Sequence, residues 1–512
     1  MTTQPWPVRL AFLLTVAWGA AFIWLAPHPP MIDLAQHAGQ LALLKQMLAG
    51  GSPWTPLFQI NPVTPYFIGF ALTLPLTYVL PVAAAMKLVL SLAYVAFVGM
   101  CVVLRRHFGA DARLDWLFVC SFFGFAWHWG FFTFLTAAPL GLLFILLADR
   151  QARSGSLRHG LQLLVTGLVL LVSHGLVFLF ALITGVLLLV LHNRQQPATL
   201  LRRAWPHAGV VLGLLAYYVA RGPTEALLAL PPTVPSVMWQ LGLRHEVLTY
   251  AFGLAFTPLF IAAAAAFAVA PWLMGLRIDR RRACALLPFT LLALGLNFVP
   301  SFMFETSFVY QRFALFLFPA YAWIFTAPQS GNAAPAPWRS TAAVGLLMLT
   351  CWSVLGLNSV RTWNFGKEAA DFDRVTSRIE PGQRALGLVF DKASPASGDS
   401  GTYVHYTSWY QAEHQGLVDF NFAWVPPQIV RYRVDQRPAV SMKFAWFADK
   451  FDWTTHQGDL YRYFIVRGSE AAAAKAFQGA PCAPVRVQQS GLWQVYERAA
   501  CPVHQGSAPR AP

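Results

Sequence analysis

Long apolar runs alternate with short polar stretches over the first 360 residues, and this pattern predicts a set of membrane-spanning helices. A helix rises about 1.5 Å per residue, so about 20 apolar residues are needed to cross a bilayer. We expect about 11 spans, within a range of 10 to 13, because several runs are short. They lie near residues 8–26, 82–104, 115–128, 131–148, 158–173, 175–191, 206–221, 248–273, 283–300, 313–328 and 340–358.

The pattern changes after residue 360 to segments that mix charged and aromatic residues. A helical period at 367–379 is followed by a strand-like run at 385–390. Later, 461–468 and 491–498 read as strands around an Ala-rich helix near 471–477. The fold class predicted is therefore an α-helical polytopic membrane domain, residues 1–360, with a C-terminal soluble α/β domain, residues 361–512.

Composition supports this division, since 56% of the residues are hydrophobic, 12% are charged and the mean hydropathy is +0.49. The formal net charge is +15, but the excess lies in the membrane part. Residues 1–360 hold 20 Lys and Arg against 8 Asp and Glu, whereas residues 361–512 hold 17 against 14. The nearly balanced tail argues against nucleic acid as a partner.

Basic residues gather in the loops on the cytoplasmic side of a membrane, which orients the predicted spans. With the N-terminus inside and 11 spans, 15 of the 20 Lys and Arg of the membrane part fall on the inner side. This solution requires the Pro-flanked run 66–80 to remain outside as an interfacial or re-entrant helix. We therefore expect an integral protein of a bacterial inner membrane, with a cytoplasmic N-terminus, a long first outer loop at 27–81 and a periplasmic C-terminal domain.

Two features of the tail leave alternatives open. Cys482 and Cys501 can pair if the tail lies outside the cytoplasm, or they can remain two unrelated thiols. The aromatic-rich stretch 405–424 can contribute to a carbohydrate surface, but we favour the interpretation that its rings form the core of the tail.

The first outer loop carries the candidate chemistry. As a helix it places Asp33, Gln36, His37 and Gln40 on one polar stripe. One interpretation makes Asp33 the N-cap of an interfacial helix whose stripe faces water. The functional interpretation makes Asp33 a general base at the membrane surface, with His37 one turn further on to orient it or to touch a phosphate.

The other outer loops, near 222–247 and 301–312, supply charge that complements Asp33. Arg244 lies in the first of them, and Glu305, Tyr310 and Arg312 lie in the second. Arg312 stands at the mouth of an apolar span, where an unpaired guanidinium is costly. It can snorkel or pair with Glu305, or it can clamp a lipid phosphate.

Two histidines within the predicted spans, His128 and His174, are interpreted as structural residues at helix breaks. The histidines and carboxylates form no recognisable set of metal ligands along the chain, so neither a metal nor a cofactor is expected.

The whole arrangement resembles the class C glycosyltransferase superfamily, multi-span enzymes that take sugars from polyprenyl-phosphate donors. Relatives include protein O-mannosyltransferases and lipid A aminoarabinose transferases. Local support comes from PPMIDLAQH in the first outer loop, from NPVTPYFIGF followed by the span that ends in LRRHFG, and from YRYFIVRG to WQVYER in the tail.

The resemblance implies an active site on the outer face, with Asp33 as catalytic base and Arg312, Arg244 or Lys45 as ligands of the lipid phosphate. Glu305 and Tyr310 are further candidates for substrate binding. Many members carry paired acids and Lys-Pro-Pro in the first loop, whereas this chain has a lone Asp33 preceded by Pro29 and Pro30. The difference argues against a metal-dependent oligosaccharyltransferase and predicts a metal-independent enzyme.

The predicted function is transfer of a sugar from a polyprenyl-phosphate donor to a lipid, glycan or protein acceptor. The surrounding membrane lipid is a further expected partner. Asp33 would take a proton from the acceptor as it attacks the anomeric carbon. Two alternatives come from other classes: a transporter or flippase of a lipid-linked saccharide, and a catalytically silent assembly subunit.

Overall fold

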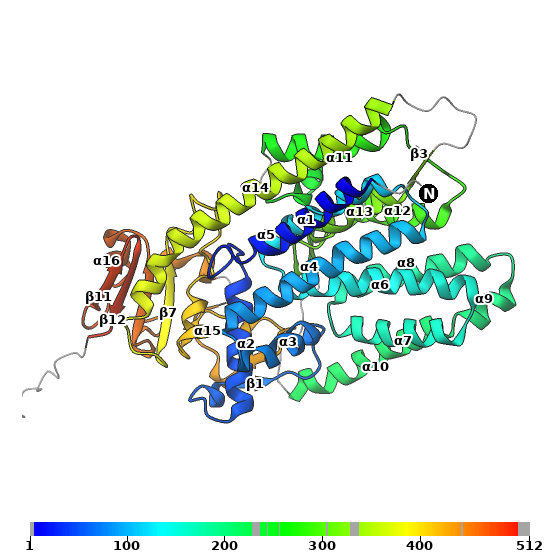
Figure 1. The fold of residues 1–512 in the computed structure, drawn as a ribbon. Helices are drawn as coiled ribbons and strands as arrows, with labels where there is room; N and C mark the ends of the chain where they lie inside the picture. The colour runs from blue at the N-terminus through cyan, green and yellow to red at the C-terminus, as the bar shows by residue number, and fades with distance from the viewer. Residues whose placement is uncertain are drawn as a thin grey trace, which may run out of the picture.

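Most of the chain is helical, and the helices lie side by side along an elongated molecule whose C-terminal domain covers one end (Figure 1). This computed structural model describes residues 5–227, 236–242, 244–254, 257–303, 306–327, 337–441 and 444–499. The main helices of the first part are α1 (Trp6–Phe22), α4 (Val82–His107), α6 (Phe132–Ser154), α7 (Leu157–Leu171), α8 (Gly175–Asn193), α9 (Pro197–Arg203), α10 (Trp205–Leu227), α11 (Pro258–Leu273), α12 (Ala283–Phe298), α13 (Ala314–Trp323) and α14 (Pro337–Thr376).

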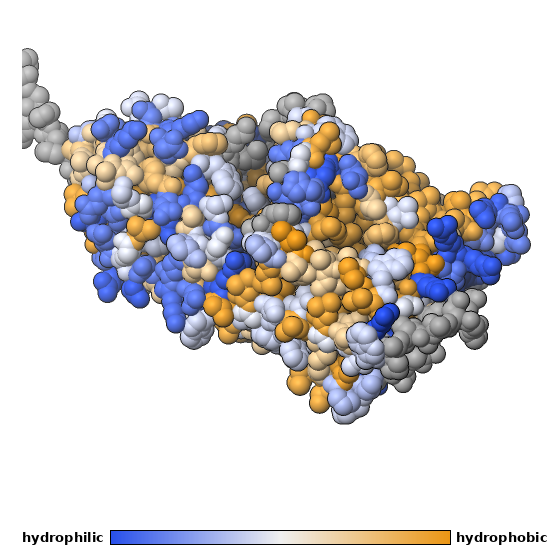
Figure 2. Space-filling model, turned by 90° about the horizontal axis from the view of Figure 1, so that it is seen from above, coloured by the Kyte–Doolittle hydropathy of each residue, from blue (hydrophilic) through white to orange (hydrophobic). Residues whose placement is uncertain are grey.

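Four of the described helices, α4, α6, α8 and α14, are long and apolar enough to cross a membrane by length and composition. Others, such as α1, α7, α11 and α12, are apolar but shorter. Large apolar side chains on the outer faces of these helices are exposed, among them Leu92, Val165 and Val219. Figure 2 shows a broad apolar surface over the helical part, between hydrophilic surfaces at the C-terminal domain and at the opposite tip. A membrane domain therefore fits the structure, while the count of about 11 spans stays a prediction.

The helical part has two distinct ends, which we name after an acidic residue at each. At the Asp33 end, the backbone N–H of Phe67 donates to the carbonyl of Val172, just after α7. At the Asp149 end, Asp149 near the end of α6 contacts His107 at the end of α4. Successive helices run back and forth between these two ends.

The predicted span at 115–128 is not one continuous helix, in keeping with the helix break expected at His128. The chain here forms three short helices, η3 (Ala112–Phe118), η4 (Ser121–Phe123) and α5 (Phe125–Trp129). A glycine stands at the break before α5, where another segment packs closely: a Cβ at Gly124 would lie 2.3 Å from the carbonyl oxygen of Tyr250. Apolar composition predicted a buried segment correctly but did not reveal this close packing.

The run 66–80 forms two short pieces, α3 (Phe67–Thr73) and η2 (Leu74–Tyr78). Seven α-helical residues rise only about 10 Å, a third of a bilayer core. The change to a 3₁₀ helix coincides with Pro75, which cannot donate a backbone hydrogen bond. The segment is therefore too short to span, as expected of an interfacial or re-entrant helix, while its side of the membrane stays a prediction.

The C-terminal domain contains a five-stranded sheet with the order β11-β12-β10-β7-β8. Its strands are β7 (Arg384–Val389), β8 (Leu417–Asp419), β10 (Tyr463–Arg467), β11 (Val485–Ser490) and β12 (Trp493–Glu497). β10 and β8 pair parallel to β7, whereas β12 pairs antiparallel with β10 and β11. The helices of this domain are α15 (Ser408–Glu413) and α16 (Glu470–Ala476). The predicted strands β7, β10 and β12 and the Ala-rich helix α16 are confirmed.

The helix α14 crosses the predicted domain boundary at 360 without a break and ends against the sheet.

Two alternatives were left open for the tail. Cys482 is disulfide-bonded, whereas Cys501 lies outside the described residues, so the pairing of these two cysteines stays open. The buried rings of Tyr406, Trp409 and Tyr410 confirm that the aromatic-rich stretch builds a core.

The first outer loop folds against the C-terminal domain. Its helix α2 (Leu34–Ala49) packs on α15, and β1 (Phe58–Ile60) pairs antiparallel with β9 (Val430–Tyr432). The small strands β2 (Val237–Met238), β4 (Phe302–Met303) and β5 (Thr306–Ser307) form one sheet in the helical part, and β3 (Arg277–Ile278) pairs with β6 (Phe325–Thr326). The loop thus joins the two parts of the molecule at the Asp33 end.

Candidate functional site

Asp33 occupies the N-cap position of α2 and is held there through its backbone. Its N–H donates to the carbonyl of Trp129 at 2.9 Å, and the N–H of Ile32 donates to the carbonyl of His128 at 3.1 Å. The carboxylate makes no capping hydrogen bond to α2. Asp33 is therefore the N-cap residue by position, as one interpretation predicted, but its carboxyl group does not cap the helix and lies instead beside Trp129 and His405.

Gly130 makes this approach of two backbones possible. Its φ of +87° is in the left-handed region, and a Cβ there would lie 2.8 Å from the nitrogen of Asp33. A glycine is required at this position for both reasons. Sequence inspection did not single it out.

The polar stripe of α2 does not face water, which corrects the second half of that interpretation. Gln36, His37 and Gln40 are all buried, with at most 4% of each residue exposed. Gln36 accepts from the N–H of Phe422 at 2.8 Å, and Gln40 accepts from the N–H of Val430 at 3.0 Å. The stripe is instead the surface on which the C-terminal domain docks.

Burial also changes the chemistry of Asp33, whose side chain is only 13% exposed. Loss of hydration raises its pKa to about 8, and the nearby Arg312 partly opposes this rise. A carboxyl group in water would be ionised at neutral pH, whereas burial keeps Asp33 largely protonated there. The carboxyl group is poised to exchange a proton near neutral pH instead.

His405 of the C-terminal domain also lies beside the carboxyl group, with its Nε2 3.5 Å from Oδ1 of Asp33. Burial lowers the pKa of His405 to about 3, so its ring is neutral at pH 7 and the contact is not an ion pair. No local pattern indicated His405, because it lies 372 residues further along the chain inside an aromatic segment.

Arg312 brings a positive charge to the same place. It is 8% exposed, its guanidinium lies 3.5 Å from the ring centre of Phe131, and it donates to the carbonyl of Ser307 at 3.0 Å. Its Nε–H has no hydrogen-bond partner among the described residues. Burial lowers its pKa to about 10, which leaves it charged at pH 7. A buried cation with unused donors is suited to bind an anion.

His37 lies beside this pair among the rings of Phe70, Phe132 and Phe422. Burial lowers its pKa to about 3, with the positive charge of Arg312 as a second cause. Its Nδ1 is buried and has no partner among the described residues. His37 therefore presents a neutral imidazole, and its link to Asp33 is the backbone bond of the helix.

Arg244 and Tyr310 form a neighbouring cluster. The guanidinium of Arg244 lies 3.7 Å from the ring centre of Tyr310 and donates to the carbonyl of Val299 at 2.6 Å. The hydroxyl of Tyr310 is buried without a partner among the described residues. Glu305 lies outside the described residues.

Lys45 is not part of the Asp33 site. It lies 12 positions further along α2, about 18 Å at the helical rise. It donates to the carbonyl of Thr77 at 2.6 Å and lines a cavity of about 780 Å³ beside α15. The structure therefore brings together Asp33, His37 and Arg312 and leaves Lys45 apart.

The histidines interpreted as structural do have structural contacts. His174 caps α8 by accepting from the N–H of Leu176 at 3.3 Å, and His128 contacts Asp399 at 3.2 Å. No set of metal ligands was expected from the sequence, but the fold brings together two groups of possible metal ligands from distant parts of the chain. They are Asp149, His192 and Cys284, and His28, Asp373 and Glu413.

The fold is shared with class C glycosyltransferases of known structure, and the resemblance predicted from the sequence is confirmed at this level. The crystal structure of ArnT from Cupriavidus metallidurans bound to undecaprenyl phosphate is similar with a TM-score of 0.55 and 13% identity, over 96% of this chain and 97% of that one. The cryo-EM structure of the mycobacterial arabinofuranosyltransferase AftD is similar with a TM-score of 0.52 and 15% identity, over 96% of this chain and 41% of that one. No family model and no curated protein sequence matches this chain.

Proposed function

We propose that this protein is a membrane glycosyltransferase that moves a sugar from a polyprenyl-phosphate donor to an acceptor at the Asp33 end. The observation that carries the proposal is a buried carboxyl group, Asp33, within electrostatic reach of a buried and incompletely paired cation, Arg312. Support also comes from the shared fold, since the similar ArnT structure holds undecaprenyl phosphate.

The reaction needs one proton acceptor and one anion-binding group. Asp33 takes the proton from an acceptor hydroxyl or amine as that atom forms a bond to the anomeric carbon. The bond between the anomeric carbon and the phosphate oxygen breaks, and the polyprenyl phosphate leaves with the electron pair. Arg312 stabilises the charge on this phosphate, a role that a well-placed donor fills with about 3 kcal/mol. Direct displacement inverts the anomeric configuration.

The other candidate residues take smaller parts in this proposal. His37 offers its neutral ring to a sugar hydroxyl, and Tyr310 with Arg244 supports the loop that carries Arg312. Lys45 is left out of the phosphate site because of its distance along α2. The chemistry of transfer is proposed without a metal ion.

We also propose that the Asp33 end and the C-terminal domain, residues 361–512, face the periplasm of a bacterial inner membrane. The Asp149 end then faces the cytoplasm, where the surplus of basic residues belongs. This orientation brings the site to the side on which lipid-linked sugars meet envelope acceptors.

The test is sugar transfer from lipid-linked donors by membranes that carry wild type or Asp33→Asn. The matched control is Asp459→Asn, which removes a carboxylate that is 68% exposed on the C-terminal domain. We expect Asp33→Asn to lose at least about 100-fold in rate, as for a general base, and the control to keep wild-type activity.

Other outcomes distinguish the alternative functions. Undiminished transfer by Asp33→Asn would remove Asp33 as the base. Accumulation of lipid-linked saccharide across vesicles without a new covalent product would identify a flippase. A cellular phenotype that survives both Asp33→Asn and Arg312→Gln would identify a silent assembly subunit.

A further inference from the structure

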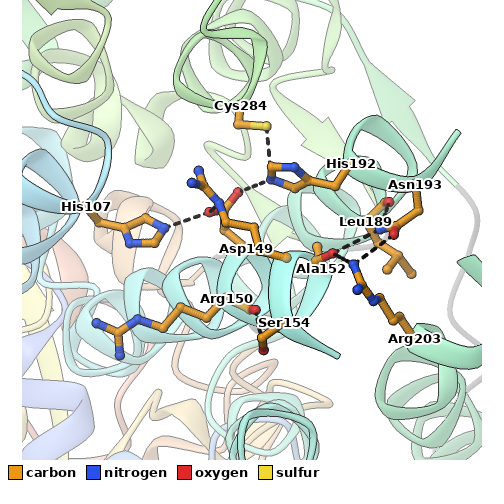
Figure 3. Close-up of polar contacts among 11 residues, drawn as sticks. His107, Asp149, Arg150, Ala152, Ser154, Leu189, His192, Asn193, Arg203 and Cys284 are labelled. Carbon is orange, nitrogen blue, oxygen red and sulfur yellow. Dashed lines mark hydrogen bonds and ion pairs between the residues drawn. The ribbon is translucent and has the colours of Figure 1, made fainter. Parts of the chain in front are cut away.

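A second polar cluster lies at the Asp149 end, remote from the proposed transfer site. Asp149 near the end of α6, His192 near the end of α8 and Cys284 at the start of α12 point toward one another (Figure 3). Their ligand atoms, one from each residue, all lie within 4.8 Å of one another. The three helices that carry them are separate in sequence and meet here.

We propose that this cluster is a zinc-binding site. Thiolate, imidazole and carboxylate are the three ligand types that zinc takes in proteins, and they select against magnesium and calcium. A zinc ion with one thiolate and one carboxylate is also neutral overall, which suits a partly buried place. The proposal does not depend on the proposed glycosyltransferase activity.

The distances fit a zinc site in its metal-free geometry. Nε2 of His192 is 2.8 Å from Oδ1 of Asp149 and 3.2 Å from Sγ of Cys284. Ligand atoms around tetrahedral zinc are about 3.3–3.6 Å apart, from bond lengths of 2.0–2.3 Å. Small side-chain movements of roughly half an ångström therefore make room for the ion.

Hydrogen bonds alone leave Nε2 of His192, Oδ1 of Asp149 and Sγ of Cys284 incompletely satisfied. Nε2 of His192 carries at most one proton, and it is in contact with a carboxylate oxygen and a sulfur at the same time. A thiol is a weak partner in either direction. A divalent cation in place of that proton satisfies all three atoms together.

Neighbouring side chains orient the carboxylate of Asp149 for binding the proposed ion. The other oxygen of Asp149, Oδ2, accepts from His107 at 2.7 Å and from Arg153 at 2.7 Å. These two donors leave Oδ1 turned toward His192, as outer partners do in metal sites. Asp149 is fully buried, whereas His192 is 22% exposed and Cys284 is half-buried, which gives an ion a path from solvent.

Three protein ligands leave a fourth position for water or another small ligand. The ion would tie α6, α8 and α12 together at the end of the molecule opposite Asp33. We infer that the site binds zinc and holds these three helices together.

The experiment measures zinc in the purified full-length protein in detergent, taken from the monodisperse fraction. Wild type is expected to hold about one zinc per chain. Cys284→Ser and His192→Ala are expected to lose most of it, by roughly tenfold or more. Matched controls are Cys101→Ala, a buried thiol in α4, and His159→Ala, a histidine at the same end that contacts Ser154.

Cobalt gives a readout that does not depend on metal carried through purification. After chelation and addition of Co²⁺, wild type is expected to show a thiolate-to-cobalt charge-transfer band that Cys284→Ser lacks. Wild type that holds no more zinc than Cys284→Ser and shows no such band would overturn the proposal. The cluster would then be an ion-pair network among Asp149, His107, His192 and Arg153.

Discussion

Asp33 shows what burial does to a carboxyl group at the edge of an apolar domain. Its position after the first apolar helix was enough to nominate it, but its protonation depends on neighbours that come from the other end of the chain. His405 lies beside it, and the charge of Arg312 partly opposes the rise of its pKa. At the residue scale, these two neighbours from distant parts of the chain turn a surface acid into a candidate base.

The pH dependence of transfer follows from this pKa. The base form of Asp33 is the carboxylate, so kcat/KM is expected to rise with pH and to level off above about 8. Arg312 lowers the pKa of Asp33, so Arg312→Gln removes this effect and moves the midpoint to higher pH. Rate profiles of both proteins measure the shift. A midpoint that stays in place would separate Arg312 from Asp33.

Asp33 also makes stability depend on pH. Its pKa is 3.8 in ordinary surroundings and about 8 in the folded protein, so between these values the folded state binds more protons. Stability is therefore lost as pH rises from about 4 to about 8. Asp33→Asn keeps the shape without the charge, and its Tm is expected to exceed that of wild type by more at pH 8.5 than at pH 6. Equal Tm differences at both pH values would contradict a buried, uncharged Asp33.

Gly130 offers a steric test of the same site. Gly130→Ala adds a Cβ that meets the backbone of Asp33 at 2.8 Å, in addition to the strain of a φ of +87°. The matched control is Gly50→Ala, where φ is +73° and nothing lies within 4 Å of the added atom. Both variants carry the left-handed cost of about 1–2 kcal/mol, but only Gly130→Ala is expected to lose transfer activity. Transfer assays at equal amounts of folded protein measure the difference.

At the scale of elements, α2 is the joint between the helical part and the C-terminal domain. Gln40 is 1% exposed, and its side chain accepts from the backbone of β9. Gln40→Leu leaves the N–H of Val430 buried without a partner, at a cost of about 1–3 kcal/mol. We expect faster hydrogen exchange across 430–432, with no change in Gln46→Leu, where the glutamine is half-buried near the end of α2 and bonds Ser52.

The elements that the sequence predicted are those with a local signal. The helical period of α2 and the strand patterns of β7, β10 and β12 depend on neighbours within a few residues, and all four are confirmed. The polar stripe of α2 was also correct as a stripe. Its partners are Phe422 and Val430, nearly 400 positions away, so its burial had no signature in a single sequence.

The same reason explains the other differences. The close packing at Gly124 involves the carbonyl of Tyr250, and Asp33 is in contact with His405. Ligands of the Asp149 cluster are 43 and 92 positions apart. Each of these contacts requires the tertiary fold, which propensity and spacing do not encode.

On the scale of the whole molecule, one apolar band separates two polar ends (Figure 2). The C-terminal domain and Asp33 belong to one end, while Asp149 and the Arg-rich loops belong to the other. A bilayer around the band forces these two ends onto opposite sides. The orientation of the whole protein in the membrane therefore follows from the side on which either end lies, and a single labelling experiment determines it.

That experiment places new cysteines one at a time, two at the Asp33 end and one at the Asp149 end, and labels intact cells with a membrane-impermeant maleimide. Asp459→Cys lies in the C-terminal domain, Gly51→Cys in the first outer loop and Gln195→Cys between α8 and α9, and all three positions are exposed. If the surplus of basic residues faces the cytoplasm, Asp459→Cys and Gly51→Cys react in intact cells. Gln195→Cys reacts only after the membrane is opened, and unmodified protein sets the background from Cys284. The reverse pattern would place Asp33 in the cytoplasm, where the proposed lipid-linked donor would have to be presented from the inner leaflet.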